Sequence, residues 1–110
     1  MAQTAKRLIS GSQLTGSAAT YYTTPAATTT IIKKLIFCNT TAGAVTVTVY
    51  LVPSGGTAGV TNEITAVHSV AVNETWSCPE AENMVLPTGG FIQALGLSVT
   101  IMASGIEIGT

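Results

Sequence analysis

The sequence contains no aspartate, and only 8% of its 110 residues are charged, against about 25% in a typical soluble domain. Four basic residues and five glutamates leave a net charge of −1. So few cations neutralise few phosphates, which disfavours nucleic-acid binding. A nearly neutral surface of Thr, Ser, Gly and Ala keeps copies of a protein apart poorly. We therefore expect other subunits or a partner to cover much of the surface; the alternative is a neutral monomeric β-domain.

Residues that carry catalysis or bind metals are equally scarce. His68 is the only histidine, and without aspartate only a glutamate could orient it for nucleophilic catalysis. It falls on the apolar face of a predicted strand, where a packed structural histidine is expected. Cys38 and Cys78 have no Cys or His at zinc-motif spacing. The glycine-rich run 54–59 lacks the Gly-Lys-Thr ending of a phosphate-binding loop. We expect no enzyme, no metal site and no cofactor.

Long hydrophobic runs are also missing. No segment approaches the ~18 apolar residues of a membrane span, and only Leu8-Ile9 follows the basic pair Lys6-Arg7, which is too short for a secretory signal. We expect a chain that is made in the cytoplasm and does not bind membranes. Two cysteines in that compartment are most simply buried free thiols, with a disulfide between adjacent strands as the alternative.

What the sequence does contain is β-strand pattern. From Val45 to Leu51, apolar residues alternate with Thr and Tyr, which is typical of a half-buried strand. Residues 31–38 are apolar on both faces except at Lys33 and Lys34, which favours a strand covered on both sides or nearly so. The link of residues 39–43 has a normal hairpin length, and Gly43 is free to take a positive φ. The pattern therefore predicts a central hairpin, in which a charge at Val47 should unfold the domain.

Further short apolar segments are separated by Gly, Pro and Asn, and they predict strands at 20–23, 63–72, 75–78, 84–86, 91–95 and 97–108. The last strand should be bent or bulged near Gly105. About eight short strands without a convincing helix indicate an all-β fold, a single antiparallel β-sandwich over residues 20–110. A jelly-roll-like arrangement is preferred, and an immunoglobulin-like one suits the same pattern. Residues 1–19 form an N-terminal arm or a short strand at 6–9, which would dock on a neighbouring subunit or on its own domain.

Charge is unevenly distributed along the chain. All four basic residues lie in the first half and all five glutamates in the second. If the two sets occupy different faces, copies of the chain could meet head to tail, with a basic edge against an acidic edge. The alternative is that the charges are scattered and solvated.

The run IIKKLIFCNTTAGAVTVTVYLVPSGGTAG, residues 31–59, resembles small β-sandwich virion proteins of tailed bacteriophages. Tyr22-Thr23-Thr24-Pro25-Ala26 and Gly105-Ile106-Glu107-Ile108 fit the same pattern. The resemblance implies a non-enzymatic virion structural protein. In the preferred version it is a homotrimeric cement or decoration protein on the outer capsid surface, which bridges neighbouring major capsid subunits. The alternative is a neck, tail or head-fibre component, including a module that uses exposed aromatic residues to bind host-surface glycans.

On either reading the partners are other copies of the chain, with a trimer favoured, and the major capsid protein or other virion subunits. The regions expected to make these contacts are the N-terminal arm with its basic pair, the strand with the two tyrosines, and exposed loops such as residues 54–59. The candidate interface residues are Lys6, Arg7, Tyr21, Tyr22, Lys33 and Lys34.

Overall fold

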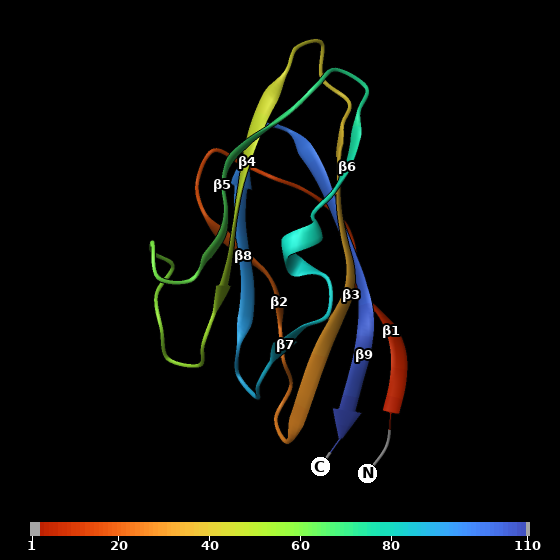
Figure 1. Cartoon of the computed structure of the whole chain (residues 1–110), viewed down its shortest axis with the longest axis vertical. Helices are drawn as coiled ribbons and strands as arrows, with labels where there is room; N and C mark the ends of the chain where they lie inside the picture. Colours follow the sequence, from red (N-terminus) through yellow and green to blue (C-terminus); the bar gives the residue numbers. More distant parts are fainter. Residues whose placement is uncertain (1–2, 110) are drawn as a thin grey trace.

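The structure, a computed structural model, describes residues 3–109 as two antiparallel β-sheets packed face to face (Figure 1). The all-β sandwich predicted from the sequence is confirmed. No helix within residues 3–109 has the length and apolar character needed to cross a membrane. The elements in chain order are β1 (Gln3–Gln13), β2 (Ala19–Thr23), β3 (Thr28–Asn39), β4 (Val45–Val52), β5 (Glu63–Val70), β6 (Thr75–Ser77), the 3-10 helix η1 (Pro79–Ala81), β7 (Met84–Leu86), β8 (Phe91–Gly96) and β9 (Val99–Gly109).

The strand order identifies the topology. One sheet runs β1-β9-β3-β6, with β7 also paired to β3, and the other runs β2-β8-β4-β5. Strands β6 and β7 both pair with β3 and are separated by η1, so they can be counted as one strand. In this count β8 and β9 become the seventh and eighth strands. The orders 1-8-3-6 and 2-7-4-5 are then those of a jelly roll. In an immunoglobulin-like sandwich several consecutive strands share a sheet, whereas here only β4 and β5 do.

The predicted central hairpin is wrong. β3 belongs to the five-stranded sheet and β4 to the four-stranded one, so residues 40–44 cross between the sheets. The buried side chain of Asn39 holds this crossing. Its Nδ2 donates to the carbonyls of Gly43 (2.9 Å) and Val70 (3.0 Å), and its Oδ1 accepts from the amide (2.9 Å) and hydroxyl (2.7 Å) of Thr41. Gly43 is not among the described glycines with positive φ, so the freedom predicted for it is not used.

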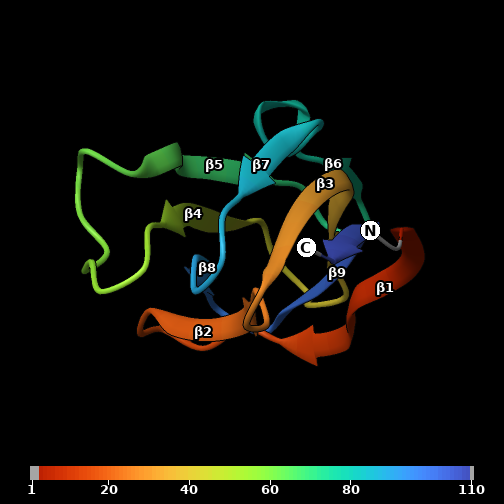
Figure 2. The ribbon, with the colours of Figure 1, turned by 90° about the horizontal axis from the view of Figure 1, so that it is seen from below.

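The hairpin that does form joins β4 to β5 through residues 53–62. This loop extends from the side of the molecule opposite β1 (Figure 1 and Figure 2). In β4, Val47 and Val49 are fully buried, as the alternating pattern predicts. Their burial between the sheets supports the expectation that a charge at Val47 unfolds the domain.

A bulge in β3 explains its two adjacent lysines. The pairing of β3 with β9 shifts register between Ile32 and Lys34, opposite Gly105, so the extra residue lies in β3 and not in the last strand, where the sequence predicted a bend or bulge. Ile32 is buried before the bulge and Leu35 after it, while both intervening lysines are exposed. The inner face of β3 is therefore fully buried, whereas its outer face is only half-buried.

The core lies between the two sheets, where Phe37, Ile92 and Ile101 are fully buried. At one side Phe37 stacks on Trp76, with ring centroids 5.8 Å apart, and Trp76 stacks on His68 at 3.7 Å. His68 on β5 thereby packs against β6 of the other sheet. The packed position predicted for this histidine is confirmed.

The N-terminal segment is a strand of the five-stranded sheet. β1 pairs with β9 from Gln3 to Gln13, which is longer than the strand at 6–9 that the sequence indicated. An exposed strand edge can recruit a strand from another chain unless it is short, bulged or charged. Here β1 shifts register twice, β2 has five residues, β5 shifts register beside Val67 (φ 49°), and η1 separates β6 from β7. All four edges are therefore irregular or short, which leaves the faces of the sandwich as the better surfaces for assembly.

Candidate interaction surface

The outer face of the five-stranded sheet carries rows of apolar side chains. Residues paired directly across an antiparallel ladder project from the same face. Ile31 pairs with Ile106 and with Val85, and Ile36 pairs with Met102. All five are half-buried or exposed, and Val85 on the edge strand β7 is 51% exposed. These two rows form an apolar surface that the chain itself leaves uncovered.

A basic row separates the two apolar rows. Ser104 on β9 pairs with Arg7 on β1 and with Lys34 on β3. Arg7, Lys34 and Ser104, together with Ile36, Met102 and Ala103, line a shallow depression of about 160 Å³. We call these six residues the Arg7–Lys34 depression.

The two cations of the depression differ in their partners. The guanidinium of Arg7 is exposed and forms no ion pair or side-chain hydrogen bond with any residue of 3–109. The Nζ of Lys34 lies 3.4 Å from Oε2 of Glu82, but the two side chains are 58% and 36% exposed. Exposed pairs of this kind contribute little to stability, so both cations remain available to an external anion.

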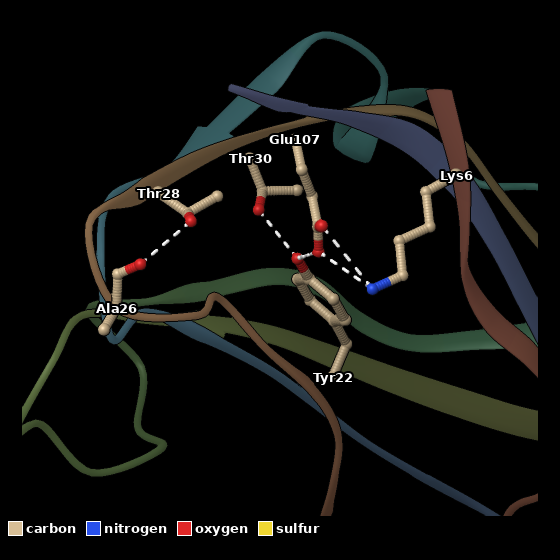
Figure 3. Close-up of polar contacts among 6 residues, drawn as sticks. All are labelled: Lys6, Tyr22, Ala26, Thr28, Thr30 and Glu107. Atoms are coloured by element: carbon tan, nitrogen blue, oxygen red, sulfur yellow. Dashed lines mark hydrogen bonds and ion pairs between the residues drawn. The ribbon is translucent and has the colours of Figure 1, made fainter. Parts of the chain in front are cut away.

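Lys6 and Tyr22 take part in a different arrangement, in which both side chains point toward Glu107 (Figure 3). The Tyr22 hydroxyl donates to Oε2 of Glu107 at 2.5 Å and lies 2.8 Å from the Thr30 hydroxyl. Lys6 Nζ is 3.4 Å from the same Glu107 oxygen. Burial of the ring, followed by the bond to Glu107, raises the pKa of Tyr22 to about 12. Tyr22 is 8% exposed, so its hydroxyl joins the two sheets and is not free for an external contact.

The remaining candidates lie apart from the depression. Tyr21 is half-buried and packs against the core. Lys33 is exposed, and its Nζ donates to Oδ1 of Asn83 at 2.7 Å. Of the six residues proposed from the sequence, the structure brings Arg7 and Lys34 together in the depression and Lys6 and Tyr22 together around Glu107. The depression also uses Ile36, Met102 and Ser104, which the sequence did not single out. The sequence gives little indication that these residues form a site, because apolar residues occur on both faces of β3 and β9.

The charges are not segregated as a head-to-tail arrangement would require. Lys6 pairs with Glu107, and Lys34 pairs with Glu82. In each pair a basic residue from the first half of the chain meets an acidic residue from the second. The fold thus interleaves the two sets, since β1 and β3 lie on either side of β9 in one sheet.

The two cysteines are free, so the alternative of a disulfide is not realised. Cys78 is fully buried, with Sγ 3.4 Å from the Thr65 hydroxyl and 3.5 Å from Oε1 of Glu80. Burial raises the pKa of its thiol, which makes it a poor nucleophile. Cys38 is half-buried on the outer face of β3. Within residues 3–109 no three His, Cys or Glu side chains gather as a metal site would require.

The fold is similar to that of chains from solved virus particles. A chain in the structure of the Gx strain of infectious bursal disease virus is 16% identical, with a TM-score of 0.53; the match covers 96% of this chain and 32% of that one. The D431N mutant VP2 protein of the same virus, from derived T=1 particles, is 14% identical with a TM-score of 0.52, over 96% of this chain and 31% of that one. The present chain thus spans about a third of the length of these capsid chains. At such identity the similarity concerns the fold.

No protein-family model matches the chain, and a search of curated protein sequences found no match. The class that the geometry defines is therefore a jelly-roll sandwich of a kind found in viral capsid chains.

Proposed function

We propose that this protein is a non-enzymatic structural subunit of a virus particle, and specifically a cement or decoration protein of a tailed bacteriophage. The observation that carries the proposal is the outer face of the five-stranded sheet, where two uncovered apolar rows flank the Arg7–Lys34 depression. Contiguous apolar surface rimmed by polar residues is typical of protein–protein contact sites. The capsid chains that share the fold support the class of protein.

The mechanism would be mechanical. Each copy bridges neighbouring major capsid subunits on the outer surface of the shell, and a homotrimer presents several such faces at once. Linked contacts reinforce each other, because once one site is bound the next binds at a high effective concentration. Modest contacts repeated over many copies would then stiffen the shell against internal pressure.

An enzymatic role gains no support from the groups that could carry it. His68 is stacked on Trp76 within the fold, and Cys78 is fully buried with a raised thiol pKa. The depression of about 160 Å³ is also smaller than the roughly 300–1,000 Å³ of typical small-molecule sites.

The test is the number of copies of this protein in each purified virus particle of its source, measured by quantitative mass spectrometry. We expect a number comparable to that of the major capsid protein. A number that matches the low symmetry of a neck or tail would favour a component of those structures, including a glycan-binding module. Absence from the particle would overturn the proposal.

A further inference from the structure

The Arg7–Lys34 depression has the size and chemistry of a socket for one side chain of a partner protein. Its volume of about 160 Å³ suits a single side chain better than a free ligand. The guanidinium of Arg7, the ammonium of Lys34 and the hydroxyl of Ser104 line it together with Ile36 and Met102. The guanidinium of Arg7 has no ion-pair partner among residues 3–109, so it can form a two-pronged hydrogen bond to a carboxylate.

The residues around the depression indicate which side chains of the partner should lie on either side of its carboxylate. Along β9 the outward-facing residues are Met102, Ser104 and Ile106. Alternate residues of a strand are spaced by about 7 Å. An extended segment laid along β9 therefore matches the surface if its own alternate side chains are apolar, acidic and apolar. Its acidic side chain then meets Arg7 and Lys34, while its apolar neighbours cover the Ile31–Ile106 and Ile36–Met102 rows.

A second copy of the same face is a poor occupant. If two such faces meet about a two-fold axis near Ser104, Arg7 and Lys34 of one copy oppose those of the other, and like charges repel. The partner must instead supply a carboxylate.

Other surfaces of this chain have few carboxylates to offer. Glu107 is held by Lys6 and Tyr22, while Glu82 already lies beside the depression of its own copy, where it contacts Lys34 and Ser77. Oε1 of Glu80 accepts from Thr65, and Oε1 of Glu74 accepts from the amide of Ala71. Only Glu63 lacks such a contact with residues 3–109.

We propose that the outer face of the five-stranded sheet binds a different protein, through an extended segment with apolar, acidic and apolar side chains at alternate positions. The acidic side chain occupies the Arg7–Lys34 depression. This inference names the partner chemistry of the surface in the proposed function and rests on that function for its biological meaning.

The test uses the full chain and a defined probe. The probe is a blocked heptapeptide of sequence TITETIT, and its control is TITQTIT, which lacks the carboxylate. Titration is followed by two-dimensional amide NMR. We expect saturable shifts at residues 7, 34 and 102–104 with TITETIT, at least about tenfold weaker binding of TITQTIT, and weakening with added salt.

Two variants with the same change in net charge distinguish binding at the depression from a general effect of the protein's charge. Arg7→Glu should weaken TITETIT binding by about tenfold or more, whereas Lys33→Glu, outside the depression, should leave it within about twofold. Both side chains are exposed, so both variants should fold, which the amide spectrum itself checks.

Three results would overturn the inference. They are equal binding of the two peptides, equal effects of the two variants, and loss of self-association in Arg7→Glu, which would make this face a contact between copies. The peptide result does not depend on the copy number in particles. If the peptide binds but the protein is absent from the particle, the proposed function alone is overturned. If the protein is present in many copies but peptide binding does not depend on charge, only the proposed partner chemistry is overturned.

Discussion

The phenolic hydroxyl of Tyr22 on β2 donates a 2.5 Å hydrogen bond to the carboxylate of Glu107 on β9, and so connects the two sheets of the sandwich. Tyr22→Phe removes this donor and the contact with Thr30 while leaving the ring in place. We expect a loss of about 1.5–3 kcal/mol in the free energy of unfolding, the range for a hydrogen bond to a charged group. Urea unfolding measures it. Tyr21→Phe, at a neighbouring half-buried tyrosine with no such bond to residues 3–109, should change stability far less; equal losses would contradict the assignment.

The same contact predicts how stability depends on alkaline pH. The pKa of Tyr22 is raised from 10.0 to about 12 in the folded chain. Between these values the unfolded chain has lost the phenolic proton and the folded chain has kept it, so stability falls as pH rises. The contribution is fully present below pH 10 and is lost as pH rises through about 12. Urea unfolding from pH 8 upward should show a steeper decline for the wild type than for Tyr22→Phe, and parallel declines would refute the prediction.

Gly105 is the glycine whose replacement should be felt most in β9. A Cβ at this position would collide with the carbonyl oxygen of Ile31 and lie 2.9 Å from Cδ1 of Leu8. Gly105→Ala should therefore destabilise the fold by about 1–3 kcal/mol or more, as overpacking does. At Gly43 nothing lies within 4 Å of an added Cβ, so Gly43→Ala should be neutral or slightly stabilising. Thermal unfolding of the two variants provides the comparison, and similar losses in both would be inconsistent with it.

The two free thiols should differ in reactivity. Cys38 is half-buried and Cys78 is fully buried, with its thiol pKa raised by burial. Because the thiolate is the reactive form, a thiol reagent at pH 8 should label one cysteine in the native chain and the second only after unfolding. Cys38→Ser should remove the fast reaction. Fast labelling that persists in this variant would show that Cys78 is accessible.

The sequence was sufficient for what depends on local pattern and insufficient for pairing across the molecule. The alternation around Val47 predicts a half-buried strand, and Val47 is fully buried. The partner of that strand was mispredicted, because a five-residue link suits a hairpin as well as a crossing between sheets. What decides is the buried Asn39, whose amide bonds to Gly43 and to the distant Val70. A contact with a residue so far along the chain leaves no local signal.

The candidate site shows the same limit. Arg7 and Lys34 were singled out as members of two separate basic pairs, but their meeting at Ser104 depends on β9 lying between β1 and β3. The apolar residues of β9 were visible, yet nothing local shows which face of the strand the core covers. Tyr22 is the converse case, because a tyrosine that looks suited to a subunit contact is buried against Glu107.

The position of β9 also bears on the order of events during synthesis. Strand β9 lies between β1 and β3, and it supplies Met102, Ser104 and Ile106 to the outer face. A nascent chain therefore cannot close this sheet until β9 has left the ribosome, and such long-range pairing is slow. The proposed binding surface forms only once β9 is in place, so chains that lack β9 carry no socket with which to enter an assembly.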